Sequence, residues 1–360
     1  MSPDPLGIAL IGGGFMAAVH SRAARAAGAR IIGVTSSTPQ RSRDAAERIG
    51  TDRAFDDVDA LLADPAVDVV HVVTPNATHH ALTVRALAAG KHVVCEKPLA
   101  TTVADAVDLE QRATAAGVVA AVPFVYRFHP MVREARARVA SGQVGQLFSV
   151  QGAYLQDWLL AAGDDNWRVS TEQGGASRAF ADIGSHLCDL LEFVTGERLV
   201  RLQAVTRMVF AERASTGPVS TEDLAGVLAH TGSGAVVSLL VSQVAPGRKN
   251  GLVLEVHGAI ESLRFEQERP EELWIGRRTG SELQLRNTDE LHPDAARLSV
   301  LPPGHPLGYQ DAFTAFAADT YAAVRGAAPV GLPVFADGVR AARITEAVLA
   351  SAASGAWIDL

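Results

Sequence analysis

Short apolar runs alternate with amphipathic segments along the first third of the chain. Four runs rich in Val, Ile and Leu have the length of buried strands, and they lie at 6–14, 29–37, 67–75 and 91–98. Three segments with apolar residues at helical spacing separate them, at 15–27, 39–50 and 78–90. Strands without polar alternation are buried on both faces, as in parallel sheets covered by helices. The pattern predicts an α/β domain with a parallel sheet.

The pattern changes near Pro123. Further strands are predicted at 146–155, 199–210, 224–230, 234–243 and 252–257, and helices at 131–141, 182–196, 308–325 and 335–353. The turn sequences "HTGSG" and "HGAIES" join strands that are close in sequence, which is typical of antiparallel pairing. We therefore expect a first domain at 1–124 and a second, α+β domain at 125–360 with a large, mostly antiparallel sheet. The C-terminal helix is free to pack back on the first domain.

Composition narrows the class of partner. The 360 residues are 48% hydrophobic and 20% charged, with a net charge of −8. An acidic chain without a basic run is a poor ligand for nucleic acid or an anionic membrane, so we expect neither partner. Cys95 and Cys188 lie in apolar segments, which argues against disulfides and favours a reducing, cytoplasmic location. The first apolar run is too short to cross a bilayer.

A glycine-rich turn joins the first strand to the first helix in "IGGGFMAAVH". Gly12 allows a tight turn, Gly14 lets the backbone approach a diphosphate, and Ala17 lets the helix pack closely on the sheet. The helix N-terminus, at Phe15 and Met16, then faces the phosphate charge. This strand–turn–helix context predicts a Rossmann dinucleotide-binding domain, the alternative being a plain glycine-rich turn.

The end of the second strand bears on which dinucleotide is bound. NAD-binding proteins place an acidic residue there to hold the ribose hydroxyls. Here Ser36 and Ser37 occupy that position, with Arg41 and Arg43 close by. Small hydroxyls and arginines accommodate a 2′-phosphate, so the segment favours NADP within an NAD(P) assignment. The alternative is that these arginines are solvated charges on the next helix.

The fourth strand ends in "HVVCEKPLA", where Glu96, Lys97 and Pro98 follow a buried run. Ligands of doubly wound sheets bind at the carboxyl ends of the strands, which is where this lysine is expected. A lysine held beside apolar walls can exchange a proton near neutral pH, as a catalytic group must. The alternative is a structural lysine neutralised by Glu96.

A second set of chemical groups lies in "DIGSHLCD". Asp182, His186 and Asp189 are spaced i, i+4 and i+7, which places them on one face of a predicted helix. A carboxylate beside an imidazole raises its basicity, as a general base requires. A metal site would need further ligands, and none has matching spacing, so no metal is expected. The alternative is a helix N-cap at Asp182 with an incidental histidine.

Taken in order, the glycine loop, "TPNATHHALTVRALAAGKHVVCEKPLA" and "DIGSHLCDLLEFVTG" resemble the family of glucose–fructose oxidoreductase, inositol dehydrogenase and the rhizopine catabolism protein (Gfo/Idh/MocA). The resemblance covers nearly the whole chain, and the EKP motif followed by D-x-x-x-H is specific. It implies that Lys97 is the catalytic lysine beside the nicotinamide and the substrate hydroxyl, with a cis Lys–Pro bond. Asp182 and His186 would contact the substrate, with His186 as the acid/base.

The resemblance also implies binding roles for other segments. Glu96 would lie near the nicotinamide ribose. The loop after the third strand would border the cofactor; it contains Thr74, Pro75, Asn76 and His79. The sequence departs from the family at Ala17, a tolerated replacement for glycine, and at Val125 in "FVYRFHP", where a polar residue is common. The departure at Val125 removes a possible side-chain hydrogen bond to substrate or cofactor but leaves the reaction unchanged.

Aromatic and polar residues before Asp182 are candidates for sugar binding, because indole faces pack on sugar C–H groups while charged groups take hydroxyls. The candidate substrate contacts are Tyr126, Trp158, Trp167, Arg168, Arg178 and His305, besides Asp182 and His186. For each residue of the loop the alternative is surface packing or a subunit contact, and for His305 it is a structural histidine.

The resulting hypothesis is an NAD(P)-dependent dehydrogenase that oxidises a hydroxyl of a sugar, polyol or sugar derivative, or runs the reverse reduction. One alternative is a non-redox sugar-processing enzyme in which a bound nicotinamide oxidises the substrate transiently. Another is a dinucleotide-sensing regulator. The resemblance also implies a homodimer or homotetramer, with the second-domain sheet available for self-association.

Overall fold

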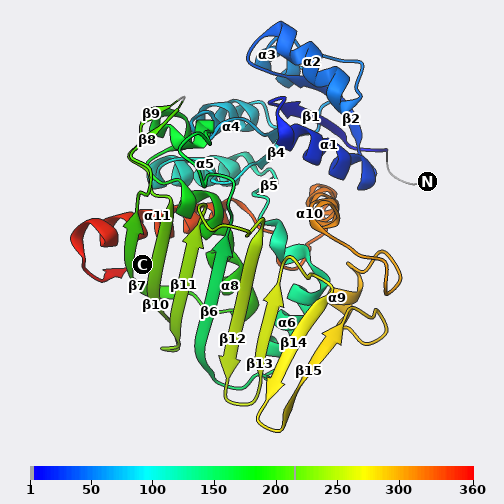
Figure 1. Ribbon diagram of the computed structural model, residues 1–360. Coiled ribbons are helices and arrows are strands. Elements are labelled where there is room, and N and C mark those ends of the chain that lie inside the picture. Colours follow the sequence, from blue (N-terminus) through cyan, green and yellow to red (C-terminus); the bar gives the residue numbers. More distant parts are fainter. Residues whose placement is uncertain (1–3, 215) are drawn as a thin grey trace. The chain divides into compact units, whose positions relative to one another are not determined.

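The computed structural model describes residues 4–214 and 216–360 (Figure 1). The chain forms two compact units. The first contains residues 4–125 and Tyr309–Arg340, and the second contains Tyr126–Gly308 and Ala341–Leu360. Each unit therefore takes its last segment from the C-terminal part of the chain.

The first unit is built on a parallel five-stranded sheet in the order β2-β1-β3-β4-β5. Its strands are β1 (Gly7–Ile11), β2 (Arg30–Thr35), β3 (Val69–Val72), β4 (His92–Cys95) and β5 (Ala120–Ala121). From β1 the chain moves first to β2 and then to β3 on the other side. This reversal leaves a crevice at the carboxyl ends of β1 and β3, where ligands of such sheets bind.

Helices cover this sheet. They are α1 (Phe15–Ala26), α2 (Pro39–Ile49), α3 (Val58–Leu62), the 3₁₀ turn η1 (Asn76–Thr78), α4 (His79–Ala88), α5 (Val103–Ala116) and α10 (Tyr309–Val324). Those predicted at 15–27, 39–50, 78–90 and 308–325 begin and end close to the predicted bounds, whereas the helices at 58–62 and 103–116 were not predicted. Thr38 caps α2 by accepting a hydrogen bond from the Arg41 amide, and Gly50 ends it at φ +67°. Leu10, Val34 and Ile49 are buried together between α2 and the sheet.

The second unit contains a nine-stranded sheet in the order β15-β14-β13-β12-β6-β11-β10-β7-β16. The strands are β6 (Leu147–Leu155), β7 (Leu199–Arg207), β10 (Leu224–Thr231), β11 (Val236–Ser242), β12 (Gly251–Gly258), β13 (Ser262–Glu266), β14 (Glu272–Arg277), β15 (Gly280–Leu285) and β16 (Ile358–Asp359). All neighbours pair antiparallel except β6 and β11. The predicted fold class is therefore confirmed, and β13–β15 extend the sheet beyond the predicted strands.

Helices cover one face of the large sheet, as Figure 1 shows for α6 (Pro130–Ala140) and α8 (Ser185–Thr195). Shorter elements complete the unit: η2 (Val125–Phe128), η3 (Trp167–Val169), α7 (Thr171–Gly174), α9 (Pro293–Ala296) and the ribbon of β8 (Glu212–Arg213) with β9 (Gly217–Pro218). Helix α11 (Phe335–Ser354) begins in the first unit, and its later turns pack beside β7, where Ser351 Oγ accepts from the Ala204 amide at 2.9 Å.

The predicted helix at 182–196 differs from the structure in its first turn. Residues Phe180–Gly184 form a π-helical turn, and the α-helix α8 begins only at Ser185. A Cβ on Gly184 would lie 2.6 Å from the Phe180 ring, so the ring packs where only glycine leaves room. π-turns inside helices are frequent at functional sites, and this one carries Asp182 just before His186.

None of the helices in the described part of the chain combines the length and the apolar character needed to cross a bilayer.

Candidate active site

The glycine loop follows β1 as the sequence predicts. Gly12 has φ +114°, and a Cβ there would lie 2.6 Å from the Val73 carbonyl oxygen, so this turn requires glycine. Gly14 is the opposite case: it has φ −80°, and a Cβ there would meet no atom within 4 Å. Gly14 is the N-cap of α1 without a side-chain cap, and the first turn of α1 holds no acidic residue. This open, uncapped helix end fits the diphosphate of a dinucleotide.

The end of β2 borders this loop. The Ser36 amide donates to Ser42 Oγ at 2.9 Å, and the Arg41 guanidinium donates to Ser37 Oγ at 3.0 Å. Arg41 is exposed. Arg48 of α2 donates to the Gly13 carbonyl and was not singled out by the sequence analysis. The arrangement places hydroxyls and guanidinium groups, and no carboxylate, at the position predicted to meet the ribose.

The loop after β3 is held by His79. The His79 ring is buried, with Nε2 2.9 Å from the Thr74 carbonyl oxygen and Nδ1 2.8 Å from the Pro98 carbonyl oxygen. An imidazole with both N–H groups present satisfies both acceptors. The His79 ring therefore ties the loop after β3 to the turn after β4, and Thr74 and Pro75 precede it at the crevice.

The EKP turn lies at the carboxyl end of β4, and the Lys97–Pro98 peptide bond is cis, as the resemblance implies. The Glu96 carboxylate is buried, and its Oε2 accepts from the Lys97 amide at 3.0 Å. Burial acts to raise the pKa of Glu96, but a hydrogen bond from His20 and the nearby charge of Lys97 outweigh it and hold that pKa below its usual range. Glu96 is thus a buried carboxylate that caps the turn bearing Lys97.

In the second unit, Asp182 is the centre of one polar cluster. Its Oδ2 accepts from Gln243 Nε2 at 2.8 Å, and its Oδ1 forms an ion pair with Arg168 Nε at 3.4 Å. The Arg168 guanidinium also lies 4.3 Å from the centroid of the Trp167 ring. The structure therefore brings together three predicted residues, and it adds Gln243, which follows β11 and has no sequence motif around it.

His186 belongs to a second cluster of the same unit. Its ring packs edge-on against Tyr126, with centroids 5.0 Å apart. The Tyr126 hydroxyl bonds to that of Tyr154, which donates to Asn250 Oδ1 at 2.6 Å. Trp158 joins the same network through Gln156. Tyr154, Gln156 and Asn250 contact predicted site residues and were not singled out by the sequence analysis.

Asp189 lies apart from these contacts. It forms a two-point ion pair with the Arg127 guanidinium, with Arg127 Nε 2.8 Å from its Oδ2. Although Asp182, His186 and Asp189 are spaced i, i+4 and i+7, the contacts described for each involve different partners, and the π-turn alters the helical phase before His186. Asp182 still lies near the Tyr126 ring that packs on His186, because burial and, to a smaller extent, the Asp182 charge raise the pKa of Tyr126.

Two predicted substrate contacts have other surroundings. Arg178 is fully buried and pairs with Asp223, which also pairs with Arg213 at 2.8 Å. Burial opposes the charged form of Arg178 and lowers its pKa despite Asp223. His305 is exposed, and its backbone carbonyl accepts from Arg286. Arg178 has the environment of a structural anchor, and His305 that of a surface loop residue.

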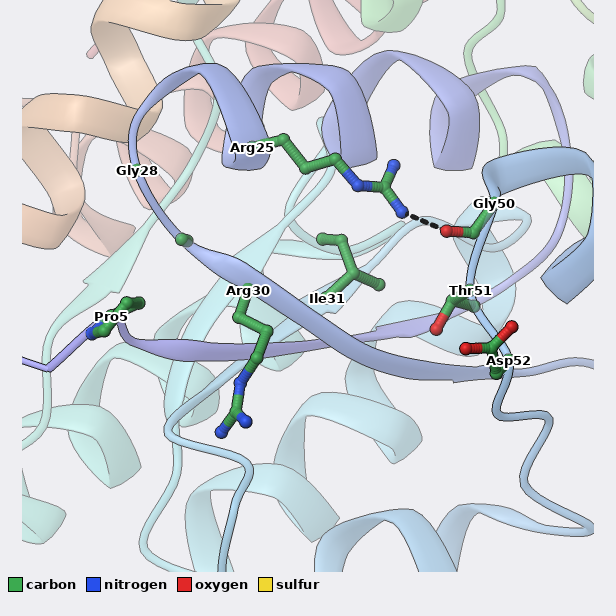
Figure 2. A pocket seen from close by; sticks show the side chains of 9 residues that line it. Pro5, Arg25, Gly28, Arg30, Ile31, Gly50, Thr51 and Asp52 are labelled. Carbon is green, nitrogen blue, oxygen red and sulfur yellow. Dashed lines mark hydrogen bonds between the residues drawn. The ribbon is translucent and has the colours of Figure 1, made fainter.

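Figure 2 shows a pocket of about 490 Å³ in the first unit, at the start of β2. It is lined by Arg25, Arg30 and Asp52 among others, and Arg25 donates to the Gly50 carbonyl at 2.6 Å. The pocket lies at the amino end of β2, whereas doubly wound sheets bind ligands at the carboxyl ends. We assign it no role in the reaction. Within residues 4–214 and 216–360, no three His, Cys, Asp or Glu side chains are placed to hold a metal ion.

Comparison with known proteins matches both units. Residues 6–124 match the model of an oxidoreductase family with an NAD-binding Rossmann fold, and residues 132–264 match the GFO/IDH/MocA C-terminal domain. Levoglucosan dehydrogenase of Pseudarthrobacter phenanthrenivorans is 30% identical over 99% of this chain and 98% of its own length.

Solved structures give the same result. A levoglucosan dehydrogenase in complex with NADH and levoglucosan is 31% identical, with a TM-score of 0.92 over 99% of both chains. An inositol dehydrogenase homologue from Azotobacter vinelandii, complexed with NADH and myo-inositol, is 28% identical, with a TM-score of 0.87 over 99% of this chain and 98% of the other. The predicted resemblance is confirmed.

The two glycines of the loop predict opposite effects of substitution. In Gly14→Val the added side chain points into open space, so the melting temperature should stay within about 2 °C while NADH affinity falls at least tenfold. In Gly12→Ala a Cβ meets the Val73 carbonyl at positive φ, so the free energy of unfolding should fall by about 1–3 kcal/mol. Thermal denaturation and NADH fluorescence titration measure both. Unchanged NADH affinity in a folded Gly14→Val protein would contradict the assignment.

Proposed function

Because this chain belongs to the GFO/IDH/MocA family of NAD-binding oxidoreductases, we propose that it oxidises a hydroxyl of a sugar or polyol through Lys97, Asp182 and His186. It is an oxidoreductase that acts on CH–OH groups, and its relatives are sugar and polyol dehydrogenases. One observation carries the proposal for the site. Within a single sheet, the uncapped glycine loop after β1 and the Lys97 turn after β4 lie at the same carboxyl edge.

The residues of the first unit fit a nicotinamide dinucleotide. When bound, the nicotinamide accepts the hydride that leaves the substrate carbon. Gly12, Gly14, Phe15 and Met16 hold the diphosphate, and Thr74, Pro75 and Asn76 border the cofactor. His79 contributes indirectly: its buried ring bonds to the Thr74 and Pro98 carbonyl oxygens and so holds the loop that borders the cofactor.

The catalytic roles are assigned residue by residue. His186 takes the proton of the substrate hydroxyl, and the Tyr126 ring fixes the plane of its imidazole. Asp182, held by Gln243 and Arg168, binds the substrate as a charged acceptor. Lys97 stabilises the negative charge that develops on the substrate oxygen as its proton leaves. Positioning and preorganised charge supply most of the rate enhancement.

In this proposal the indole rings of Trp158 and Trp167 and the Arg168 guanidinium form the sugar-binding surface, and Tyr126 contributes beside His186. Arg178 supports this surface from the interior through its ion pair with Asp223. His305 remains a candidate second contact on an exposed loop. Levoglucosan, L-sorbose and myo-inositol, which the solved relatives bind, are the first compounds to test.

NAD binding follows from family membership, and we propose that this chain prefers NADP. The support is the end of β2, where Ser36 and Ser37 stand in place of a carboxylate and Arg41 contacts Ser37 Oγ. An exposed guanidinium at this point can pair with a 2′-phosphate. Cytoplasmic location is part of the same proposal, because Cys95 and Cys188 are both buried free thiols.

The open face of the nine-stranded sheet supports self-association as a homodimer or homotetramer. Strand register places five apolar or small residues in one row across this face: Val205, Gly226, Leu240, Ala153 and Val253. Val205 is 69% exposed and Leu240 46%. A second copy of the same sheet is the occupant we propose, because packing two such faces buries the row symmetrically.

Turnover tests the proposed function. Wild-type protein should reduce NAD⁺ or NADP⁺ with at least one sugar or polyol of the panel, followed as absorbance of the reduced nicotinamide. Lys97→Met and His186→Phe should each lower kcat about 10²- to 10⁴-fold, the range of general acid–base catalysis. Lys91→Met is the matched control, since the Lys91 ammonium bonds only to the Asp64 and Val67 carbonyls among the contacts described.

Two other outcomes have distinct meanings. Sugar conversion without net reduction of either nicotinamide would replace the dehydrogenase by the non-redox enzyme. Tight dinucleotide binding with no conversion of any panel member would favour the sensing regulator. Full activity of Lys97→Met would remove Lys97 from the proposed mechanism.

Cofactor preference is tested at the end of β2. Arg41→Ala should lower kcat/KM for NADP⁺ relative to NAD⁺ by about 10- to 100-fold, since a hydrogen bond to a charged group contributes about 1.5–3 kcal/mol. Ser36→Asp should shift the ratio the same way by adding a ribose acceptor that repels the phosphate. Arg43→Ala, which removes a guanidinium paired with Gln40, is the control and should change nothing. A ratio that Arg41→Ala leaves unchanged would contradict the NADP assignment.

Self-association is tested by introducing a charged side chain into the apolar row. Leu240→Glu places a carboxylate in the middle of the apolar row and should convert the oligomer to a smaller species in light scattering coupled to gel filtration. Ile260→Glu adds the same charge at an exposed residue between β12 and β13, outside the row, and should leave the mass unchanged. A wild-type monomer, or a Leu240→Glu protein of unchanged mass, would contradict this interface.

A further inference from the structure

Four buried side chains of the first unit form a continuous hydrogen-bonded chain behind the Lys97 turn. Glu96 Oε1 lies 2.9 Å from His20 Nε2, and His20 Nδ1 lies 2.9 Å from His71 Nδ1. His71 Nε2 lies 3.2 Å from the Tyr321 hydroxyl. The chain joins α1, β3 and α10 to the EKP turn, and all four side chains are less than 10% exposed.

Only one set of proton positions satisfies every contact with neutral rings. An ionised Glu96 accepts only, so His20 must donate from Nε2 and keep Nδ1 as an acceptor. His71 must then donate from Nδ1, which leaves its Nε2 to accept from the Tyr321 hydroxyl. All hydrogen bonds therefore point from Tyr321 towards Glu96, and bonds aligned in this way strengthen one another.

The surroundings favour this arrangement. Burial and the nearby His20 ring hold the pKa of His71 well below its usual range, so His71 stays neutral. Burial raises the pKa of Tyr321, which keeps its hydroxyl proton available for donation. The groups that face Glu96 are His20 from α1, His79 from α4 and the neighbouring Lys97, and each lowers the pKa of this carboxyl. Phe313 of α10 packs edge-on against His20 at 5.1 Å and excludes water from that side.

We propose that His20, held by His71 and Tyr321, is a positioning residue for the reaction: it fixes the Glu96 carboxylate so that Glu96 holds the turn of Lys97. The contact that transmits the effect is the Lys97 amide, which donates to Glu96 Oε2 at 3.0 Å while His20 holds the other oxygen. Without His20 the carboxylate loses one of its two fixed partners and can rotate away from the amide. The inference rests on the proposed catalytic role of Lys97.

The protein contains only three lysines, which makes a direct test of this positioning role possible. Protein labelled with ¹⁵N-lysine shows the backbone amides of Lys91, Lys97 and Lys249 alone, and Lys97→Met identifies the middle one. In His20→Phe, which keeps a ring but removes the donor, the Lys97 amide proton should move upfield because its charged acceptor is displaced. His20→Gln keeps an N–H near the Nε2 position and should restore the wild-type position. The experiment needs neither cofactor nor substrate.

His92→Phe is the matched control. His92 is a half-buried histidine at the start of β4, whose Nδ1 accepts from the Val119 amide at 2.9 Å. This variant should move the adjacent Lys91 amide and leave that of Lys97 unchanged. Should His20→Phe fail to fold, Tyr321→Phe removes only the terminal hydroxyl of the chain and should move the Lys97 amide in the same direction by less.

Steady-state kinetics of the His20 variants test whether the hydrogen-bonded side chains affect the reaction. His20→Phe should lower kcat about 10- to 100-fold, as small misplacements of a catalytic group do, with KM for the cofactor unchanged and recovery in His20→Gln. A folded His20→Phe protein with the wild-type Lys97 amide position and wild-type kcat would overturn the proposal. Absence of turnover in the wild type would instead overturn the proposed function. The role of the hydrogen-bonded side chains in catalysis would then be overturned too, even if His20→Phe shifts the Lys97 amide.

Discussion

The loop after β3 and the turn after β4 are tied together by the buried His79 ring, which lies between the Thr74 and Pro98 carbonyl oxygens. Parallel strands bring their carboxyl ends to one edge of the sheet, but the loops that follow them have no backbone ladder to hold them together. The imidazole replaces that ladder with two hydrogen bonds. The position of Lys97 depends on it, because the Pro98 carbonyl belongs to the turn that carries the lysine.

Local sequence was sufficient for much of the first unit. Runs of buried Val and Ile predict β1–β4, and helix ends follow from Thr38, Gly50 and Gly90, whose conformational preferences are local. The glycine loop and the EKP turn were found for the same reason, since each consists of consecutive residues. His20 and His71 were missed, although a histidine inside the run "VVHVV" breaks the apolar pattern and could have been noticed.

The candidate site residues of the second unit could not be predicted in the same way. Asn250 meets Tyr154 because β12 and β6 pair with Leu252 opposite Tyr154, and a register between strands about 100 residues apart leaves no spacing signal. The π-turn at Phe180–Gly184 is a tertiary effect as well, and the i, i+4, i+7 spacing of Asp182, His186 and Asp189 could not predict it. The burial of Arg178 against Asp223 could not be predicted either, because a buried arginine and a ligand-binding arginine look alike in sequence.

Buried carboxylates are stabilised by different kinds of partner in the two units. In the second, Asp223 takes two fully buried guanidinium groups, and Arg213 in turn binds the Leu159 and Ala161 carbonyls of the loop that carries Trp158 and Trp167. Removing one partner of such a group leaves an unpaired buried charge, which is strongly destabilising. In the first, the buried Glu96 carboxylate is held by the His20 ring on one oxygen and by the Lys97 amide on the other. The effect of burial, which raises the pKa of Glu96, is outweighed by a hydrogen bond from His20 and the nearby charge of Lys97, so this carboxyl stays ionised beside the turn that carries Lys97.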